Sequence, residues 1–382
     1  MKRIAVLGAG RVGRVIAQDL ADRYDVTSLD CRAGALERAF PCGKVRTAAL
    51  DLADRDELSR AVQPHDLVVD ALPGHLGRNT LKTLIEAGKS VIDIAFFPED
   101  PFELDALARD RGVTVIVDMG LAPGMSNVLL GHHVGSLSSV DRFECLVGGL
   151  PVERTWPFEY KAPFSPADVL EEYTRPARLR RNGAEVVLPA LSEVELVDFP
   201  GIGTLEAFNT DGLRSLLRSY VDVPNLCEKT LRYPGHADQV RILRACGFFD
   251  DSPLELGDAR VRPRDLTSQL LFEHWRLEED DPEFTVMRVT VEGCEPNGDS
   301  VVHVWRLEDR RDPSTGYSSM ARTTGFACTA AVGLLLEGEF RRPGVHPPER
   351  LGEDPKLFEA LLAYQADRGV KYLHEIAGSI AS

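Results

Sequence analysis

The chain has 382 residues and a formal net charge of −16, from 44 basic and 60 acidic side chains. This length predicts two domains, because a single hydrophobic core rarely grows beyond about 250–300 residues. The negative charge argues against nonspecific binding to nucleic acid or anionic membranes, and no apolar run reaches the roughly 18 residues that span a bilayer. The chain opens on a strand pattern without a signal peptide, and its seven cysteines are scattered without a C-x-x-C pair. We therefore expect a cytoplasmic protein with reduced thiols and no zinc site.

The first twenty residues predict a strand, a glycine-rich turn and a helix. Residues 4–7 form an apolar run typical of a buried parallel strand, and apolar residues then repeat at helical spacing from residue 12 to residue 20. Between them stands a G-x-G-x-x-G motif at residues 8–13. Its first glycine allows a tight turn, its second lets a dinucleotide pyrophosphate approach the backbone, and its third lets helix and strand pack closely. The pyrophosphate would then face the positive end of the helix.

A second predicted strand, residues 25–30, ends on Asp30, twenty-two residues past Gly8. A carboxylate there is placed to accept hydrogen bonds from the adenosine ribose hydroxyls of NAD. Arg32 could pair with the 2′-phosphate of NADP, but we expect Asp30 to decide in favour of NAD. The alternative, a structural turn that binds no nucleotide, is disfavoured by the complete strand–turn–helix–strand–acid unit. The expected cofactor-binding residues are Gly8, Gly10, Arg11, Val12, Gly13, Asp30, Asp51, Leu72, Pro73 and Gly120.

From residue 1 to residue 123 strands and helices alternate, which predicts an α/β domain with a Rossmann doubly wound parallel sheet. Ligands of such sheets lie beyond the carboxyl ends of the strands, where Asp93 and Asp118 are expected. Either carboxylate could position an ammonium group or relay a proton, or could only cap a helix or bond to a loop. Further strands are expected at residues 44–50, 67–71, 91–94 and 113–117, and helices at 76–87 and 102–111.

Beyond a Gly/Pro turn at residues 119–127 the strands become neighbours in sequence. This pattern predicts an α+β substrate and dimerisation domain with a mostly antiparallel sheet over residues 124–318. A long apolar helix at 323–336 is expected to pack back on the first domain, as part of a C-terminal helical segment at 319–382. Strands are expected at 142–147, at 177–181 and 185–188 as a hairpin around Asn182-Gly183, and at 284–294 and 301–307 as a second hairpin across residues 296–299. The expected helices are 128–134, 211–220, 236–246 and 264–276.

The chain contains four distinctive blocks: DMGLAPGMSN at 118–127, FNTDGLR at 208–214, EKTLRYPGH at 228–236 and SMARTTGF at 319–326. Together these blocks resemble the saccharopine dehydrogenase/reductase superfamily, and within it they are most similar to L-lysine 6-dehydrogenases. The resemblance covers nearly the whole chain. It implies NAD-dependent oxidative deamination of the lysine ε-amine to 2-aminoadipate 6-semialdehyde, which cyclises to piperideine-6-carboxylate, with release of ammonia. Saccharopine or a polyamine-like conjugate is the alternative substrate, and a non-catalytic dinucleotide sensor is the alternative outside enzymes.

Amine oxidation requires a proton path from the nitrogen, a cation for the substrate carboxylate and a nicotinamide that accepts hydride. His236 lies before a predicted helix and could move protons or cap that helix. Lys161 lies in a rigid loop and could act as a base, hold an anion or be a surface lysine. Arg322 begins the long helix and could hold a carboxylate or form a surface salt bridge. The expected catalytic residues are Asp93, Asp118, Lys161 and His236, and the expected substrate-binding residues are Tyr160, Thr210, Arg232, Arg322 and Thr323.

The expected partners are a small amino-acid substrate and further copies of the chain, as a homodimer or higher homo-oligomer. Neither nucleic acid nor a membrane is expected as a partner. The remaining histidines show no ligand spacing, and His132 and His133 lie on a predicted helix, so no metal is expected.

Overall fold

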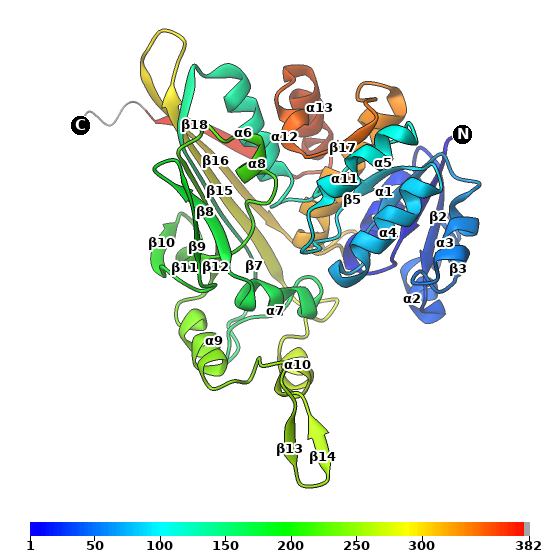
Figure 1. Ribbon diagram of the computed structural model, residues 1–382, viewed down its shortest axis with the longest axis horizontal. Coiled ribbons are helices and arrows are strands. Elements are labelled where there is room, and N and C mark those ends of the chain that lie inside the picture. Colours follow the sequence, from blue (N-terminus) through cyan, green and yellow to red (C-terminus); the bar gives the residue numbers. More distant parts are fainter. Residues whose placement is uncertain (378–382) are drawn as a thin grey trace. The chain divides into compact units, whose positions relative to one another are not determined.

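The structure is a computed structural model that describes residues 1–377, and the chain divides into two units (Figure 1). Unit 1 comprises Met1–Gly135 and Ala321–Lys371, and unit 2 comprises Ser136–Met320 and the chain from Tyr372 onward. The first division thus lies twelve residues beyond the expected position 123, because helix α6 (Met125–Ser136) packs within unit 1. A Cβ added to Gly131 on that helix would lie 2.2 Å from the carbonyl oxygen of Glu349.

Unit 1 contains a seven-stranded sheet in the order β17-β6-β5-β4-β1-β2-β3, and every described pair is parallel. This is the doubly wound sheet that the alternating pattern predicts. The added edge strand β17 comes from the C-terminal segment and was not predicted. The strands are β1 (Arg3–Leu7), β2 (Asp25–Asp30), β3 (Arg46–Ala49), β4 (Leu67–Asp70), β5 (Ser90–Asp93), β6 (Thr114–Ile116) and β17 (Gly344–His346).

The helices of unit 1 bury their apolar stripes on this sheet and on one another. Apolar side chains of α3, α4 and α5 form one core with β1, β4 and β5, and α11 packs on α1, where Gly325 meets Val15. By length and composition α11 could cross a membrane, but most of it is buried, as in the core helix of a globular domain. The helices are α1 (Arg11–Leu20), α2 (Ala33–Ala39), α3 (Arg55–Val62), α4 (Gly74–Glu86), η1 (Pro101–Leu104), α5 (Asp105–Asp110), α11 (Ser319–Glu337), α12 (Glu349–Gly352) and α13 (Pro355–Ala366).

Unit 2 contains a nine-stranded mixed sheet in the order β10-β11-β12-β7-β15-β16-β18, with β8 pairing with β12 and β9. The β12–β7 pair is parallel and the other described pairs are antiparallel. Both predicted hairpins, β8–β9 and β15–β16, are confirmed. The strands are β7 (Ser139–Pro151), β8 (Ala177–Arg181), β9 (Ala184–Leu188), β10 (Glu195–Phe199), β11 (Gly203–Asn209), β12 (Asn225–Arg232), β15 (Glu283–Cys294), β16 (Ser300–Arg310) and β18 (Tyr372–Ala377).

Two expectations for the helices were wrong. The helix expected at 211–220 is reduced to α8 (Leu216–Ser219), because Asp211 and Gly212 are held by Arg178 and Glu228 before it. The C-terminal segment is not helical throughout, since β18 joins the sheet of unit 2 as an edge strand. The other helices of unit 2 are α7 (Pro166–Thr174), α9 (His236–Ala245) and α10 (Pro263–His274).

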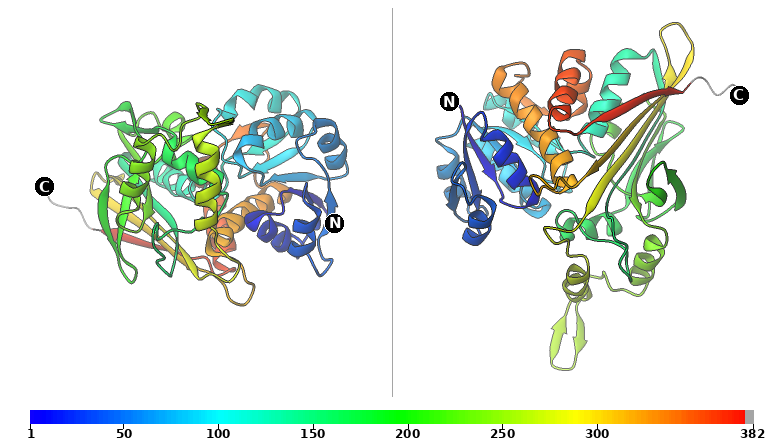
Figure 2. Two further views of the ribbon diagram at one scale, coloured as in Figure 1. Left: turned by 90° about the horizontal axis from the view of Figure 1, so that it is seen from below. Right: turned by 180° about the vertical axis from the view of Figure 1, so that it is seen from behind.

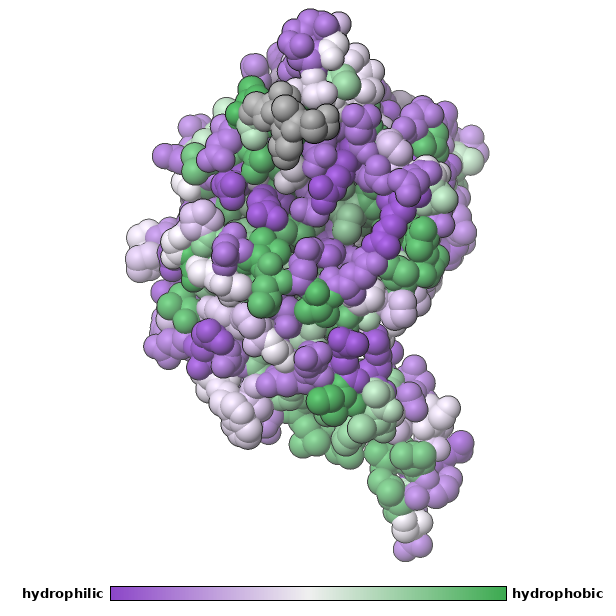
Figure 3. Space-filling model, turned by 90° about the vertical axis from the view of Figure 1, so that its left-hand side faces the viewer, coloured by the Kyte–Doolittle hydropathy of each residue, from purple (hydrophilic) through white to green (hydrophobic). Residues whose placement is uncertain are grey.

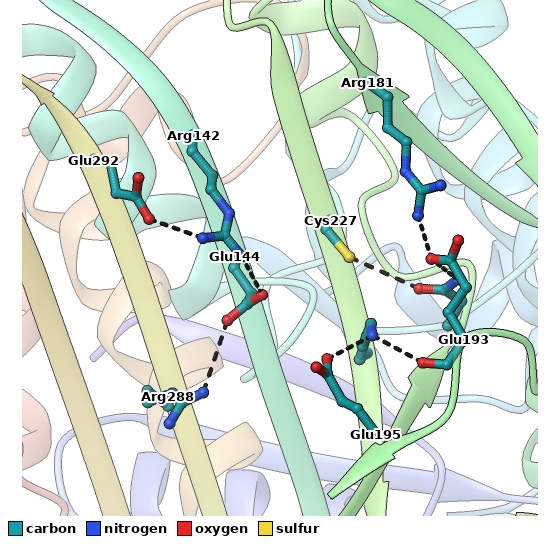
Figure 4. Close-up of polar contacts among 10 residues, drawn as sticks. Arg142, Glu144, Arg181, Glu193, Glu195, Cys227, Arg288 and Glu292 are labelled. Carbon is teal, nitrogen blue, oxygen red and sulfur yellow. Dashed lines mark hydrogen bonds and ion pairs between the residues drawn. The ribbon is translucent and has the colours of Figure 1, made fainter. Parts of the chain in front are cut away.

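One face of the large sheet carries a ladder of charged side chains (Figure 4). Arg142 on β7 donates to Glu144 at 2.8 Å and to its register partner Glu292 on β15 at 2.9 Å. Arg288 lies 3.8 Å from the other carboxylate oxygen of Glu144. Burial raises the pKa of the nearby Cys227 thiol to about 12, so this cysteine stays protonated. The ladder stabilises strand pairing by mutual neutralisation and holds no reactive group.

Candidate functional site

The turn between β1 and α1 has the geometry of a dinucleotide site. Gly8 has φ +95°, and a Cβ there would lie 2.7 Å from the carbonyl oxygen of Ala71. A Cβ on Gly13 would lie 2.1 Å from the carbonyl oxygen of Gly8. Gly10, the N-cap of α1, has nothing within 4 Å of an added Cβ. Two glycines thus permit packing, and the third leaves open space at a helix N-terminus, which suits a pyrophosphate.

Asp30 ends β2 beside this turn. Its carboxylate accepts hydrogen bonds from the Ala9 amide at 2.8 Å and the Arg32 amide at 2.9 Å. The Arg32 guanidinium adds two further bonds, at 3.2 and 3.4 Å. Burial alone would raise the pKa of Asp30, but the bonds from Arg32 and Ala9 outweigh it and lower the pKa below its usual range. The ribose position therefore holds an ionised carboxylate with an arginine bound to it.

The other expected cofactor residues lie at the ends of further strands. Leu72 follows β4, and its side chain would lie 3.5 Å from a Cβ on Gly8. Pro73 is the N-cap of α4, and the exposed Asp51 accepts a bond from the Ala53 amide. Gly120 lies in a loop that folds against Thr324 of α11. The structure brings Leu72 to the glycine turn, and the cofactor roles of these residues stay predictions.

Carboxylates gather at the neighbouring strand ends. Asp70 ends β4 and Asp93 ends β5, and the two are fully buried register partners. Each accepts a bond from the amide two residues on, from Leu72 at 3.1 Å and from Ala95 at 2.9 Å. Burial raises the pKa of Asp70 to about 7. Asp118 follows β6 with φ +53°, and the next amide, of Met119, donates to the Asp93 carbonyl.

The structure therefore places Asp93 and Asp118 side by side, as expected for strand ends of one sheet, while their catalytic role stays a prediction. Sequence reasoning missed Asp70. Its signal was the same as that of Asp93, an acid at the end of a predicted strand.

A second group of polar side chains is buried within unit 2, and we call it the Arg232 cluster. The guanidinium of Arg232 donates to Glu172 at 2.8 Å, to the Tyr173 hydroxyl at 3.1 Å and to the Tyr160 hydroxyl at 3.4 Å. Its carbon lies 4.3 Å from the centre of the Tyr160 ring, in a cation–π contact. The members come from the loop before α7, from α7, from the residue that follows β11, from β12 and from the start of α9: Tyr160, Glu172, Tyr173, Thr210, Glu228, Thr230, Arg232 and His236.

Glu228 is the second carboxyl of the cluster. It accepts bonds from the Thr210 hydroxyl at 2.7 Å and from the Gly212 amide at 3.0 Å. A Cβ on Gly212 would lie 2.4 Å from the carboxyl, so only glycine permits this approach. Burial raises the pKa of Glu228 to about 8 despite the Thr210 bond, and burial also raises the pKa of Glu172 against the effect of Arg232. Two carboxyls and one guanidinium can complement the charged groups of an amino acid.

His236 is placed differently from either sequence-based expectation. Its Nδ1 lies 3.0 Å from the carbonyl oxygen of Phe158 and its Nε2 lies 2.8 Å from the Tyr173 hydroxyl. Because a carbonyl only accepts, Nδ1 carries the proton and Nε2 accepts from Tyr173. Burial and the neighbouring Arg232 lower the pKa of His236 to about 3. The imidazole is thus neutral, bonds to no free amide of α9, and holds Tyr173 in position.

Lys161 and Arg322 lie outside the cluster. Lys161 forms an ion pair with Asp281 at 2.5 Å. Arg322 belongs to unit 1 and donates to the Arg368 carbonyl at 3.0 Å, just past the end of α13, and Thr323 is fully buried beside it.

Of the predicted residues of unit 2, the structure brings together Tyr160, Thr210, Arg232 and His236. Sequence reasoning missed Glu172, Tyr173, Glu228 and Thr230. Glu228 and Thr230 lie in the block at 228–236 and could have been found there, whereas Glu172 and Tyr173 on α7 carry no motif.

A glycine turn on a doubly wound parallel sheet, joined to an α+β unit with a buried polar cluster, defines a dinucleotide-binding oxidoreductase of two domains. Two family models match the chain: the saccharopine dehydrogenase NADP binding domain over residues 4–116, and the saccharopine dehydrogenase C-terminal domain over residues 120–370. The chain therefore belongs to the saccharopine dehydrogenase family. The superfamily predicted from the four sequence blocks is confirmed.

Curated relatives match at low identity over nearly full length. A saccharopine dehydrogenase [NADP(+), L-glutamate-forming] from Pyricularia oryzae is 23% identical over 91% of this chain and 93% of its own. A carboxyaminopropylagmatine dehydrogenase from Synechocystis is 22% identical over 94% of each chain.

Two solved structures share the fold. Saccharopine dehydrogenase (L-Glu forming) from Saccharomyces cerevisiae has a TM-score of 0.80 at 19% identity, over 99% of this chain and 100% of its own. Homospermidine synthase from Legionella pneumophila in complex with NAD has a TM-score of 0.67 at 10% identity, over 98% and 91% of the two chains. The α/β fold with a Rossmann sheet and a second mixed sheet is thereby confirmed.

Proposed function

We propose that this chain oxidises the ε-amine of L-lysine with NAD to an imine and NADH, and that water then hydrolyses the imine to ammonia and 2-aminoadipate 6-semialdehyde, which cyclises to piperideine-6-carboxylate. The observation that carries the proposal is that two carboxyls, the buried Glu228 and the partly buried Glu172, belong to one cluster with the buried guanidinium of Arg232, which Glu172 contacts. Lysine has two amines and one carboxylate, so the set offers one hydrogen-bonding group for each of them, a carboxyl for each amine and the guanidinium for the carboxylate. Saccharopine carries additional carboxylates, for which the cluster offers no second guanidinium among the residues described.

The glycine turn fits the dinucleotide, which when bound supplies the hydride acceptor. Gly10 leaves room for the pyrophosphate at the N-terminus of α1. Asp30 accepts hydrogen bonds from the adenosine ribose hydroxyls, whereas a 2′-phosphate would meet its negative charge. The Arg32 side chain is 68% exposed and can leave the carboxylate, so its bond to Asp30 does not block the ribose.

Glu228 supports the proton part of the reaction. A carboxyl with a pKa of about 8 is mostly neutral at pH 7 and ionises in the alkaline range. The lysine ε-amine has a pKa of about 10.4, so it also loses its proton as the pH rises. We therefore propose that Glu228 holds the substrate amine and that the rate rises toward alkaline pH.

The test is reduced-cofactor formation across lysine, ornithine, saccharopine, glutamate and diamines, each with NAD and with NADP. Lysine with NAD should give the highest kcat/KM, and an aminobenzaldehyde reagent should detect the cyclic imine. Glu228→Gln should weaken turnover, whereas Glu144→Gln on the charged ladder should leave it unchanged. Saccharopine or a diamine turned over far faster than lysine contradicts the substrate, and absence of turnover with every amine supports the dinucleotide sensor.

A further inference from the structure

An arm of about thirty residues projects from the rest of unit 2 (Figures 1 and 2). We define the arm as residues 246–275, which contain the hairpin of β13 (Leu254–Leu256) and β14 (Ala259–Val261) and the helix α10. Apolar side chains gather on it (Figure 3). Of the fifteen large apolar side chains exposed among residues 1–377, the arm carries five, between 47% and 56% exposed: Phe248, Leu254, Leu256, Leu266 and Leu270. This concentration marks an interaction surface.

The hairpin has no described support from another sheet. β13 and β14 pair only with each other, over three register pairs. Leu254 and Leu256 alternate with Glu255, so they lie on the same face of the hairpin. Their register partners on the neighbouring strand are Val261 and Ala259. A two-stranded hairpin of this length is marginally stable in water on its own. An exposed apolar face on such a hairpin therefore calls for an occupant.

The base of the arm is anchored in the core of unit 2, so one side of α10 is buried and the other is exposed. Leu271 and Trp275 on one side of α10 lie in the core of unit 2, with the Trp275 ring 5.5 Å from that of Tyr160 and 5.9 Å from that of Tyr173. Leu266 and Leu270, one turn apart, are exposed on α10. The anchor holds the apolar side chains of the arm in the solvent, and it joins the arm to the rings that support Arg232.

We propose that the occupant is the arm of a second copy of this chain, with the two hairpins in contact about a two-fold axis. An apolar patch that meets its own copy is self-complementary, as a two-fold interface requires. The hairpin also has no net formal charge that would repel a second copy. Residues 252–263 carry two acids and two arginines, whereas the chain as a whole carries −16. Glu255 and Arg260 are register partners with their charged groups 3.7 Å apart.

The exposed apolar area of the arm can be compared with the area that a contact between two arms requires. At about 100 Å² for each half-exposed large side chain, five side chains offer roughly 500 Å² on each copy. If all five side chains were fully covered on both copies, the contact would bury at most roughly 1,000 Å² of apolar surface, which lies at the lower limit of a specific interface. Each hairpin also retains an outer backbone edge that can pair with its counterpart.

Sedimentation velocity of the full chain over a concentration series tests the proposal. The unmodified protein should be a dimer, and Leu254→Asp with Leu256→Asp should raise its dissociation constant by about 100-fold or more, because the contact would bury unpaired charges. Leu373→Asp, at a leucine that is 64% exposed on β18, is the matched control and should leave the dimer intact. Circular dichroism checks that each variant is folded.

Hydrogen exchange gives a second measurement on the unmodified protein. The amides of β13 and β14 should be protected in the dimer and lose protection on dilution, since an isolated hairpin opens readily. A monomeric unmodified protein, a dimer that survives both aspartates, or dissociation by Leu373→Asp alone would each overturn the proposal. The last result would place the interface on the large sheet instead.

Discussion

The hydroxyl of Tyr173 lies 2.8 Å from Nε2 of His236 and accepts the Nε–H of Arg232 at 3.1 Å. Protons are thus donated in one direction, from Arg232 to Tyr173, from Tyr173 to His236, and from His236 to the Phe158 carbonyl. Burial and the neighbouring Arg232 lower the pKa of His236 to about 3, so its imidazole is neutral near pH 7. Its role in this structure is to position Tyr173, and the first prediction distinguishes positioning from proton transfer.

His236→Ala should lower the free energy of unfolding by about 2–4 kcal/mol, because it leaves a cavity and an unpaired Tyr173 hydroxyl. The pH profile of kcat/KM should keep its apparent pKa values, since no ionisation of His236 contributes to it. Denaturant unfolding and the pH profile are the two measurements, with the exposed His274→Ala as control. Loss of an apparent pKa near neutrality in the variant would show that His236 does transfer protons.

Substitution by alanine should affect cofactor binding at Gly10 and the stability of the fold at Gly13. Gly10 has space for a Cβ and φ −72°, so Gly10→Ala should leave the melting temperature of the free protein within about 2 °C while weakening dinucleotide binding about tenfold or more. Gly13→Ala forces a clash with the Gly8 carbonyl and should destabilise the fold itself. Differential scanning calorimetry with and without NAD measures both effects. Unimpaired NAD binding by Gly10→Ala would show that the pyrophosphate does not bind at this turn.

The carboxylate of Asp30 should set the cofactor preference. We expect NAD to exceed NADP in kcat/KM by at least about tenfold, about 1.4 kcal/mol. Asp30→Ser should narrow or invert this ratio, because the freed Arg32 can then pair with a 2′-phosphate, and adding Arg32→Ala should remove the gain for NADP. Asp25→Ser, at the other end of β2, is the control. Equal kcat/KM for both cofactors in the unmodified protein would falsify these roles.

The raised pKa of Glu228 should appear as a pH dependence of stability. The unfolded carboxyl ionises near pH 4.3, whereas the folded one keeps its proton to about pH 8. The unfolded state therefore binds fewer protons between these values, and the free energy of unfolding should fall as pH rises through them.

Glu228→Gln removes this ionisation and should flatten the fall, making the variant more stable than the unmodified protein by about 1 kcal/mol or more at pH 8. Urea unfolding from pH 4.5 to pH 8.5 provides the measurement. Glu144→Gln, whose carboxylate is bound by Arg142 and lies near Arg288, should bring no such gain. A parallel pH dependence in Glu228→Gln and the unmodified protein would mean that Glu228 is ionised at neutral pH.

Arg322 should prove structural. Arg322→Ala removes a donor to the Arg368 carbonyl and should lower the free energy of unfolding by about 1–3 kcal/mol, with KM for the amine changed less than about twofold. Steady-state kinetics and denaturant unfolding of the same preparation separate the two readouts. A raised KM at unchanged stability would instead support the sequence-based expectation that Arg322 binds the substrate carboxylate.

The amino-acid sequence by itself determined the features that local chemistry controls. Strand and helix periods predicted the parallel sheet of unit 1, and Asn182-Gly183 placed the β8–β9 hairpin, because such patterns act between residues close in the chain. The glycine spacing and Asp30 predicted the geometry of the turn for the same reason. The sequence also indicated Tyr160, Thr210, Arg232 and His236, through blocks shared with a family.

Only the tertiary structure decided how distant segments meet. Glu172 bonds to Arg232 across sixty residues of sequence, and Glu228 gains its pKa of about 8 from burial, which no local pattern encodes. The same holds for β17 and β18, which join two different sheets from one C-terminal segment. The contacts of His236 that favour a positioning role over proton transfer are also long-range, because its partners, Tyr173 and Phe158, lie sixty-three and seventy-eight residues away. The ionisation of a group depends on what surrounds it after folding, and that environment is assembled from the whole unit.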